Sequence, residues 1–369
     1  FGPDNQNLVD LLRSPAVAIP HSLSGQLDYI RRNWSYMLGD YLFQLLRGLD
    51  LIEEEEKAIF SGSGPALVYD FGGLDSEEER FSPDKDWMPS VVMLAKNAYV
   101  WLDQLSKKYQ YQITRLDHVP DEELENLARW GFSSLWLIGL WERSQASKKI
   151  KQMRGNPDAE ASAYSLLEYQ IASDLGGEEA YQDLRNRAWN FRIRLASDMV
   201  PNHMGIDSKW LVEHPDWFIS LDYSPFPSYS FNGPNLSGDD RVEIYLEDHY
   251  YDNSDAAVVF NRRDQGTGES KFIYHGNDGT SMPWNDTAQL NYLMPEVREA
   301  VIQTIIDVCK KFPVVRFDAA MTLTKKHFQR LWYPEPGSGG DIPSRAEFGL
   351  TKKAFDELLP VEFWQEVVD

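Results

Sequence analysis

From Asn97 onward, short apolar runs alternate with segments of helical periodicity. The runs predict four β-strands, at residues 98–102, 134–138, 193–198 and 314–318. Helical patterns separate them, and two of these patterns open on a proline, Pro120 and Pro295, which is a common first residue of a helix. Strand–helix–strand alternation predicts a parallel sheet covered by helices.

Four strand–helix units make half of an eight-stranded barrel. The expected fold class is therefore α/β, a TIM-type (β/α)8 barrel of which the first four strands are present. An open, doubly wound sheet fits the alternation equally well, but no Gly-rich phosphate-binding loop follows any of the runs. We expect a helical N-terminal accessory segment at residues 1–95 and a partial barrel at residues 96–369.

About 90 residues separate the third predicted strand from the next helix. This is too long for a simple loop in a compact domain. The stretch is rich in Tyr, Phe, Asp and Asn and carries turn signals. It predicts an inserted subdomain at about residues 204–294, on the side of the sheet where the strands end and where barrels keep their active sites.

Composition narrows the choice of partner. The chain has 369 residues and a net charge of −22, which argues against nucleic acid or an anionic membrane because both attract basic surfaces. A neutral ligand fits better, although acidity that only serves solubility is an alternative. No run approaches the 18 apolar residues of a membrane span. The single cysteine, Cys309, excludes an intrachain disulfide and is expected on the apolar face of its helix.

Two of the predicted strands end in carboxylates. In the fourth, Arg316 and Asp318 are two residues apart and therefore project from the same face. A guanidinium beside a carboxylate favours its ionised form, and an ionised carboxylate at a strand end is what a nucleophile requires. A buried Arg–Asp pair that only stabilises the sheet is the alternative.

The third strand runs from Asp198 into Asn202 and His203, so that three polar groups follow its end. Alone, this pattern fits a loop with a satisfied Asp and a surface His. It favours function here because the carboxyl ends of parallel strands meet at one edge, where Asp318 is also expected.

Four segments, taken in order, resemble motifs of the α-amylase family, glycoside hydrolase family 13. Residues 198–203 are similar to its Asp-x-x-x-Asn-His motif, and residues 316–318 to its Arg-x-Asp motif. Residues 162–176 resemble the family's segment before the third strand, and residues 286–298 its entry to the fourth. The resemblance covers roughly residues 98–369.

This resemblance implies the front half of an α-retaining glycoside hydrolase or transglycosylase acting on α-glucans such as starch, glycogen or maltooligosaccharides. Asp318 would be the nucleophile, and Arg316 would hold and ionise it. Asp198 and His203 would line the site of the attacked sugar, and Tyr164 would stack on its apolar face. The implied partner is an oligo- or polysaccharide substrate, and the sequence does not indicate an oligomeric state.

The resemblance implies no required cofactor. Asn202 matches a calcium ligand of many family members. However, Gln289 stands where a calcium-binding Asp is often found, and a hard cation prefers carboxylate oxygens. The sequence thus leaves calcium open.

The chain departs from the family pattern at several positions. Met321 and Thr322 replace a Lys-His pair, and Ser165 replaces an Asp. Retaining glycosidases also need an acid/base carboxylate about 5–5.5 Å from the nucleophile. In the family it lies on the fifth strand, which is expected beyond Asp369, because Glu362 and Glu366 fall in a helical pattern.

Both ends of the chain look cut. We expect the 369-residue piece alone to be inactive and prone to aggregation, because half a parallel barrel exposes strand edges. Two other functions stay open. One is a non-catalytic carbohydrate-binding or partner-subunit protein of the same fold. The other is an open-sheet α/β protein that binds a different small ligand.

Overall fold

The computed structural model describes residues 6–38, 83–252, 254–255, 257–279, 282–338 and 340–369. The chain divides into two compact units, Phe1–Phe81 and Ser82–Asp369. In the first unit the described residues form two helices, α1 (Leu8–Ala18) and α2 (Leu23–Leu38). The expected end of the accessory segment at residue 95 falls inside the first strand of the second unit, β1 (Met93–Asn97).

The second unit contains the predicted parallel sheet. Its four strands are β1 (Met93–Asn97), β2 (Ser134–Ile138), β5 (Arg194–Met199) and β12 (Val314–Phe317). They lie in the order β1-β2-β5-β12, and each neighbouring pair is parallel. The spatial order thus follows the chain order, as in a barrel, but the described residues form an open sheet and not a closed barrel.

The first strand was predicted in the wrong place. The apolar residues 98–102 begin helix α4 (Ala98–Tyr109), and the strand is the segment just before them. Asn97 starts this helix, because its side chain accepts a hydrogen bond from the Val100 amide over 3.3 Å. Ala98, Trp101 and Leu105 are buried, and their spacing is that of a helix face.

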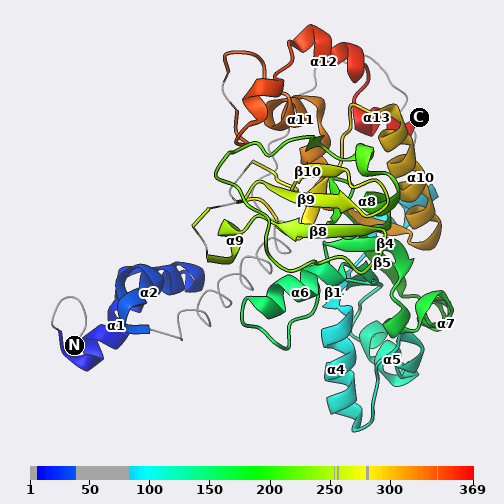
Figure 1. Ribbon diagram of the computed structural model, residues 1–369. Coiled ribbons are helices and arrows are strands. Elements are labelled where there is room, and N and C mark those ends of the chain that lie inside the picture. The colour runs from blue at the N-terminus through cyan, green and yellow to red at the C-terminus, as the bar shows by residue number, and fades with distance from the viewer. Residues whose placement is uncertain (1–5, 39–82, 253, 256, 280–281, 339) are drawn as a thin grey trace, which may run out of the picture. The chain divides into compact units, whose positions relative to one another are not determined.

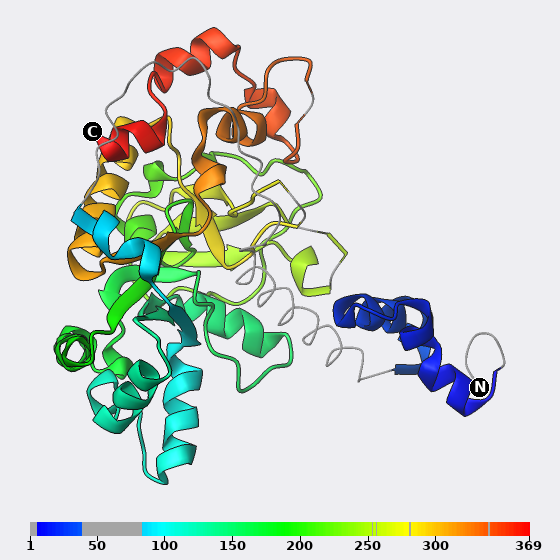
Figure 2. The same ribbon diagram turned by 180° about the vertical axis from the view of Figure 1, so that it is seen from behind.

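Helices follow the strands as expected and cover the sheet (Figures 1 and 2). Besides α4 they are α5 (Asp121–Arg129), α7 (Gly177–Asn190) and α10 (Pro295–Lys311). Helix α7 contacts β5, and α10 contacts β12. The prediction for Cys309 was wrong, since its side chain is exposed beside the buried Val308. Successive residues of a helix point about 100° apart around its axis, so Cys309 points away from the buried face that contains Val308.

A hairpin follows β2. It consists of β3 (Trp141–Arg143) and β4 (Leu166–Ile171), which pair antiparallel, with α6 (Gln145–Met153) between them. Trp141 on β3 is fully buried and packs its edge against Phe312 of the segment between α10 and β12, with ring centroids 5.6 Å apart. This aromatic contact ties the hairpin to the helix layer.

The predicted insertion is a subdomain with its own sheet. Strands β7 (Ser220–Leu221), β10 (Ser270–Tyr274), β9 (Val259–Asp264) and β8 (Val242–Leu246) pair antiparallel in this order. Helices α8 (Lys209–Glu213) and α9 (His249–Asp252) accompany them. Strand β6 (His203–Gly205) pairs with β11 (Thr287–Gln289), so the start and the end of the insertion lie side by side.

After β12 the chain forms three short helices, α11 (Lys325–Trp332), α12 (Lys352–Leu358) and α13 (Phe363–Val368). Helices α11 and α12 lie beyond the antiparallel sheet, at the opposite end of the unit from α4 and α5 (Figures 1 and 2). No helix among the described residues is long and apolar enough to cross a lipid bilayer.

Candidate active site

Three predicted site residues meet at the ends of two neighbouring strands. In the register of β5 and β12, Arg316 lies opposite Asp198. The Arg316 Nη1 atom donates to Asp198 Oδ1 over 3.0 Å and lies 3.4 Å from Asp318 Oδ2. The Arg316 guanidinium therefore bridges the carboxylates of Asp198 and Asp318, which are 120 positions apart in the chain.

Two tryptophans that the sequence analysis missed hold Asp198. Trp136 on β2 donates from Nε1 to Asp198 Oδ2 over 3.1 Å, and Trp141 donates from Nε1 to the Asp198 carbonyl over 2.8 Å. The Arg316 guanidinium also lies over the Trp136 ring, 5.2 Å from its centroid. The sequence signal that could have identified Trp136 was its position in the middle of the predicted strand 134–138, which precedes the predicted strand that contains Asp198.

The two carboxylates sit in different surroundings. Asp198 is buried, with 3% of its side chain exposed, whereas 31% of the Asp318 side chain is exposed. Burial raises the pKa of Asp198 to about 6, although hydrogen bonds from Arg316 and Trp136 act in the opposite direction. Burial also acts to lower the pKa of Arg316, but the charges of Asp318 and Asp198 outweigh it and raise that pKa above its usual value. Asp318 is thus the carboxylate that a ligand can reach.

His203 lies behind this cluster with both ring nitrogens paired inside the protein. Nδ1 is 3.4 Å from Nδ2 of Asn202, which can only donate, so Nε2 carries the proton and donates to the Tyr164 carbonyl over 3.1 Å. Burial lowers the pKa of His203, so the ring is neutral at pH 7. The Trp284 ring, with its centroid 5.1 Å away, covers one side of it.

Tyr164 is partly buried, and its phenol is close enough to Arg316 to influence that residue's pKa. The backbone carbonyl of Tyr164 accepts a hydrogen bond from His203 Nε2 over 3.1 Å. The predicted residues thus form two groups, with Arg316 joined to Asp198 and Asp318, and His203 joined to Tyr164.

The environment of Asn202 does not fit calcium. Its side chain donates to Gln289 Oε1 and accepts from Gln289 Nε2, each over 3.1 Å, and both residues are buried. The two amides satisfy each other, and neither carries the negative charge that a hard cation prefers. In the described parts of the chain, no three His, Cys, Asp or Glu side chains cluster in a way that could hold a metal ion.

The departures from the family pattern have structural roles. Ser165 is buried and donates to the Asp286 carbonyl over 2.7 Å. Thr322 is buried and donates to the Ala319 carbonyl over 2.7 Å, whereas Met321 is 57% exposed. Neither Met nor Thr brings a charge to this side of the site.

The two late carboxylates, Glu362 and Glu366, also serve the fold. Glu362 accepts the Lys325 amide at the start of α11, and Glu366 forms an ion pair with Arg298 over 2.8 Å. Both carboxylates therefore make contacts that join α11 and α13 to their neighbours.

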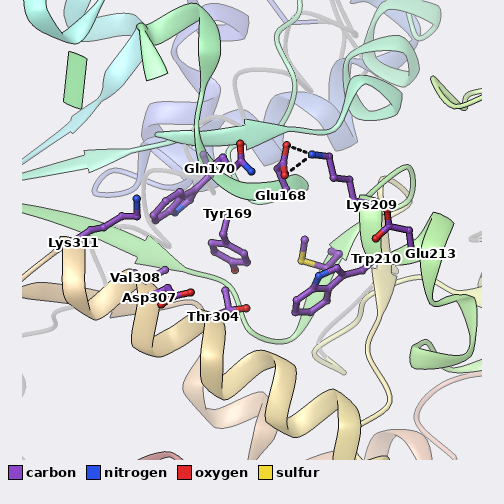
Figure 3. A pocket seen from close by; sticks show the side chains of 12 residues that line it. Glu168, Tyr169, Gln170, Lys209, Trp210, Glu213, Thr304, Asp307, Val308 and Lys311 are labelled. Carbon is purple, nitrogen blue, oxygen red and sulfur yellow. Dashed lines mark hydrogen bonds and ion pairs between the residues drawn. The ribbon is translucent and has the colours of Figure 1, made fainter. Parts of the chain in front are cut away.

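A pocket of about 280 Å³ lies elsewhere, between β4, α8 and α10 (Figure 3). None of Asp198, Arg316 and Asp318 lines it. The cavity and the charged cluster are therefore two separate features.

No protein-family model and no curated protein sequence matches the chain. It is similar to solved structures, among them a maltogenic α-amylase from Thermotoga neapolitana (17% identity, TM-score 0.39, 65% of this chain and 42% of that one). Another is an α-amylase from Lactobacillus plantarum, with 16% identity and a TM-score of 0.40 over 68% of this chain and 46% of that one. A third is a trehalose-6-phosphate hydrolase from Bacillus licheniformis, with 14% identity and a TM-score of 0.43 over 74% of this chain and 41% of that one. The chain spans less than half the length of each.

Proposed function

We propose that the chain is the front half of a (β/α)8 barrel of the α-amylase family. In this proposal the full-length protein is a retaining glycoside hydrolase or transglycosylase of α-glucans. The observation that carries the proposal is the bridge from Arg316 to Asp198 and Asp318 at the ends of adjacent parallel strands. The ordered motifs support it, because these are the residues that they single out.

In the proposed reaction, Asp318 attacks the anomeric carbon of the sugar and the glycosidic bond to the leaving oxygen breaks. Arg316 lies 3.4 Å from the attacking carboxylate and orients it. Asp198, Tyr164 and the neutral His203 shape the site around the sugar. Water or another sugar hydroxyl then displaces Asp318 from the covalent intermediate, which gives hydrolysis or transfer.

The leaving oxygen needs a proton from a second carboxylate. Asp198 is held by Arg316, Trp136 and Trp141, and Glu362 and Glu366 have roles in the fold. In this proposal a further carboxylate, other than these three, supplies the proton. The substrate is a carbohydrate, and the reaction needs no metal at Asn202.

Asp318→Asn in the full-length protein tests the proposal. The change removes the nucleophile's charge but keeps its shape, so turnover of maltooligosaccharides should fall by about three orders of magnitude or more. Asp103→Asn is a matched control, since Asp103 is exposed on α4 and belongs neither to the cluster nor to the pocket lining. Near-normal turnover in Asp318→Asn would sink the assignment.

A second function is favoured by one observation. Where the family has a Lys-His pair, this chain has an exposed Met321 and a buried Thr322. A carbohydrate-binding protein or partner subunit without catalysis would not need that pair. A full-length protein that binds maltooligosaccharides but never cleaves or transfers them would support this alternative.

A further inference from the structure

The pocket beside the candidate site has aromatic walls and a charged rim (Figure 3). Trp210 of α8 and Tyr169 of β4 extend into the space between β4 and α10. Trp141 of β3 completes the aromatic lining. At about 280 Å³ the pocket lies near the lower end of the range for small-molecule sites, which is about 300–1,000 Å³.

The polar atoms of two aromatic side chains are already used on the backbone. The Tyr169 hydroxyl donates to the Val200 carbonyl and accepts from the Val200 amide, each over 2.9 Å. The Trp141 Nε1 atom donates to the Asp198 carbonyl. Both rings are thereby held in place, and the partly buried Tyr169 offers carbon surface to the pocket while Trp141 packs behind it. Trp210 is steadied in turn by Trp217, whose ring meets it edge-on with centroids 5.3 Å apart.

The charges at the rim are largely paired within the protein. Lys209 contacts the Glu168 carboxylate over 2.7 Å, as Figure 3 shows. Lys311 is paired with Glu178, and Asp307 with Lys310. A charged ligand would have to compete with these pairs. A neutral ligand with hydroxyl groups can use the remaining donor and acceptor positions and leave the pairs intact.

We propose that this pocket binds a neutral sugar, one or two rings in size. The apolar face of a pyranose ring would lie on Trp210, and its hydroxyls would meet Glu168, Lys209 and the exposed amide of Gln170. Aromatic carbon surface together with groups that hydrogen-bond to hydroxyls is a lining that suits a neutral sugar.

The pocket is a second site and not an extension of the candidate active site. Trp141 and Tyr169 stand between the two, since each lines the pocket and holds the backbone that carries Asp198 and Val200. The inference rests on the pocket's own residues. Only the choice of an α-linked glucose dimer as the probe follows from the proposed function.

Isothermal titration of maltose into the full-length protein tests the inference, with Asp318→Asn as the background so that no turnover occurs. Trp210→Ala should weaken one binding event about tenfold or more, which corresponds to about 1.4 kcal/mol. Gln170→Ala removes an exposed side chain on β4 and should weaken the same event about threefold. Trp130→Ala is the matched control, because Trp130 is 61% exposed and lies outside the pocket.

Tyr164→Ala separates the two sites. If Tyr164→Ala abolishes all maltose binding and Trp210→Ala and Gln170→Ala leave it unchanged, the pocket inference is wrong while the proposed function stands. If Trp210→Ala and Gln170→Ala weaken the only binding event and Tyr164→Ala does not, the pocket inference holds and the proposed function loses its support. Binding of glucose 6-phosphate but not maltose, with the same dependence on Trp210, would contradict a neutral ligand.

Discussion

Arg316 on β12 stands opposite Asp198 on β5, and its Nη1 atom donates to Asp198 Oδ1 over 3.0 Å. Because Asp198 is buried, this guanidinium is the cation that compensates its charge inside the protein. The same nitrogen lies 3.4 Å from the more exposed Asp318. Arg316 thus links the stability of the sheet to the geometry of the candidate nucleophile.

Arg316→Met should destabilise the protein. The change leaves the Asp198 carboxylate buried without its cation, which costs about 3–5 kcal/mol when both partners are fully buried. Since 30% of the Arg316 side chain is exposed, solvent screening reduces the expected loss to about 1–3 kcal/mol. The free energy of unfolding from urea denaturation measures it. The double variant Arg316→Met/Asp198→Asn should recover part of the loss, and equal stability of the single variant and the wild type would contradict the pairing.

Asp198 should make the protein less stable as the pH rises. Its pKa is about 6 in the folded protein and about 3.9 in an unfolded chain, so the folded state binds an extra proton between these values. The stabilisation is fully present below pH about 4 and is lost above pH about 6, a change of about 3 kcal/mol.

Asp198→Asn should remove this part of the pH dependence. The unfolding free energy of the wild type minus that of the variant, measured by urea denaturation from pH 4 to pH 7, should therefore fall as the pH rises. Asp103→Asn, which changes a 58% exposed carboxylate on α4, is the control and should show no such trend. A constant difference for Asp198→Asn would contradict the raised pKa.

The hydrogen bonds between Gln289 and Asn202 should stabilise the loop after β5 in the absence of calcium. Gln289→Leu removes the donor to the buried Asn202 Oδ1 atom and should cost about 1–3 kcal/mol of unfolding free energy. Gln303→Leu, at an exposed position on α10, should cost little. Because Asn202 is satisfied by Gln289, the melting temperature of the wild type should be the same in millimolar calcium and in EDTA. A clear rise with calcium that Gln289→Leu abolishes would show that the amide pair binds the ion.

Tyr169→Phe should lower the free energy of unfolding, because Tyr169 holds the backbone of Val200 between the pocket and the candidate site. The lost hydroxyl leaves the buried Val200 amide and carbonyl without their partner, which costs about 1–3 kcal/mol. Tyr223→Phe makes the same change at a residue that is 55% exposed, and its unfolding free energy should stay near the wild-type value. Equal effects of the two substitutions would show that the Val200 contact contributes nothing.

Periodicity predicted three of the four parallel strands almost to the residue, because each is a short apolar run between turn signals. It failed at residues 98–102, where the apolar residues also fit a helix and Asn97 supplies the cap. Whether such a run becomes a strand depends on a neighbour to pair with, and β2 pairs with residues 93–97 instead. Cys309 was misplaced for a related reason, since a helix face is set by what packs against it.

The sequence by itself determined the order of strands and helices, the size of the insertion, and the pairing of Arg316 and Asp318 on one strand face. These features depend on local spacing and on the alternation of side chains along a strand. Only the tertiary structure decided that Arg316 pairs with Asp198. It also decided that Trp136 donates to the Asp198 carboxylate and Trp141 to its carbonyl, and that Gln289 hydrogen-bonds to the amide of Asn202. Such contacts join residues far apart in the chain, and strand register and burial select them after the elements have packed.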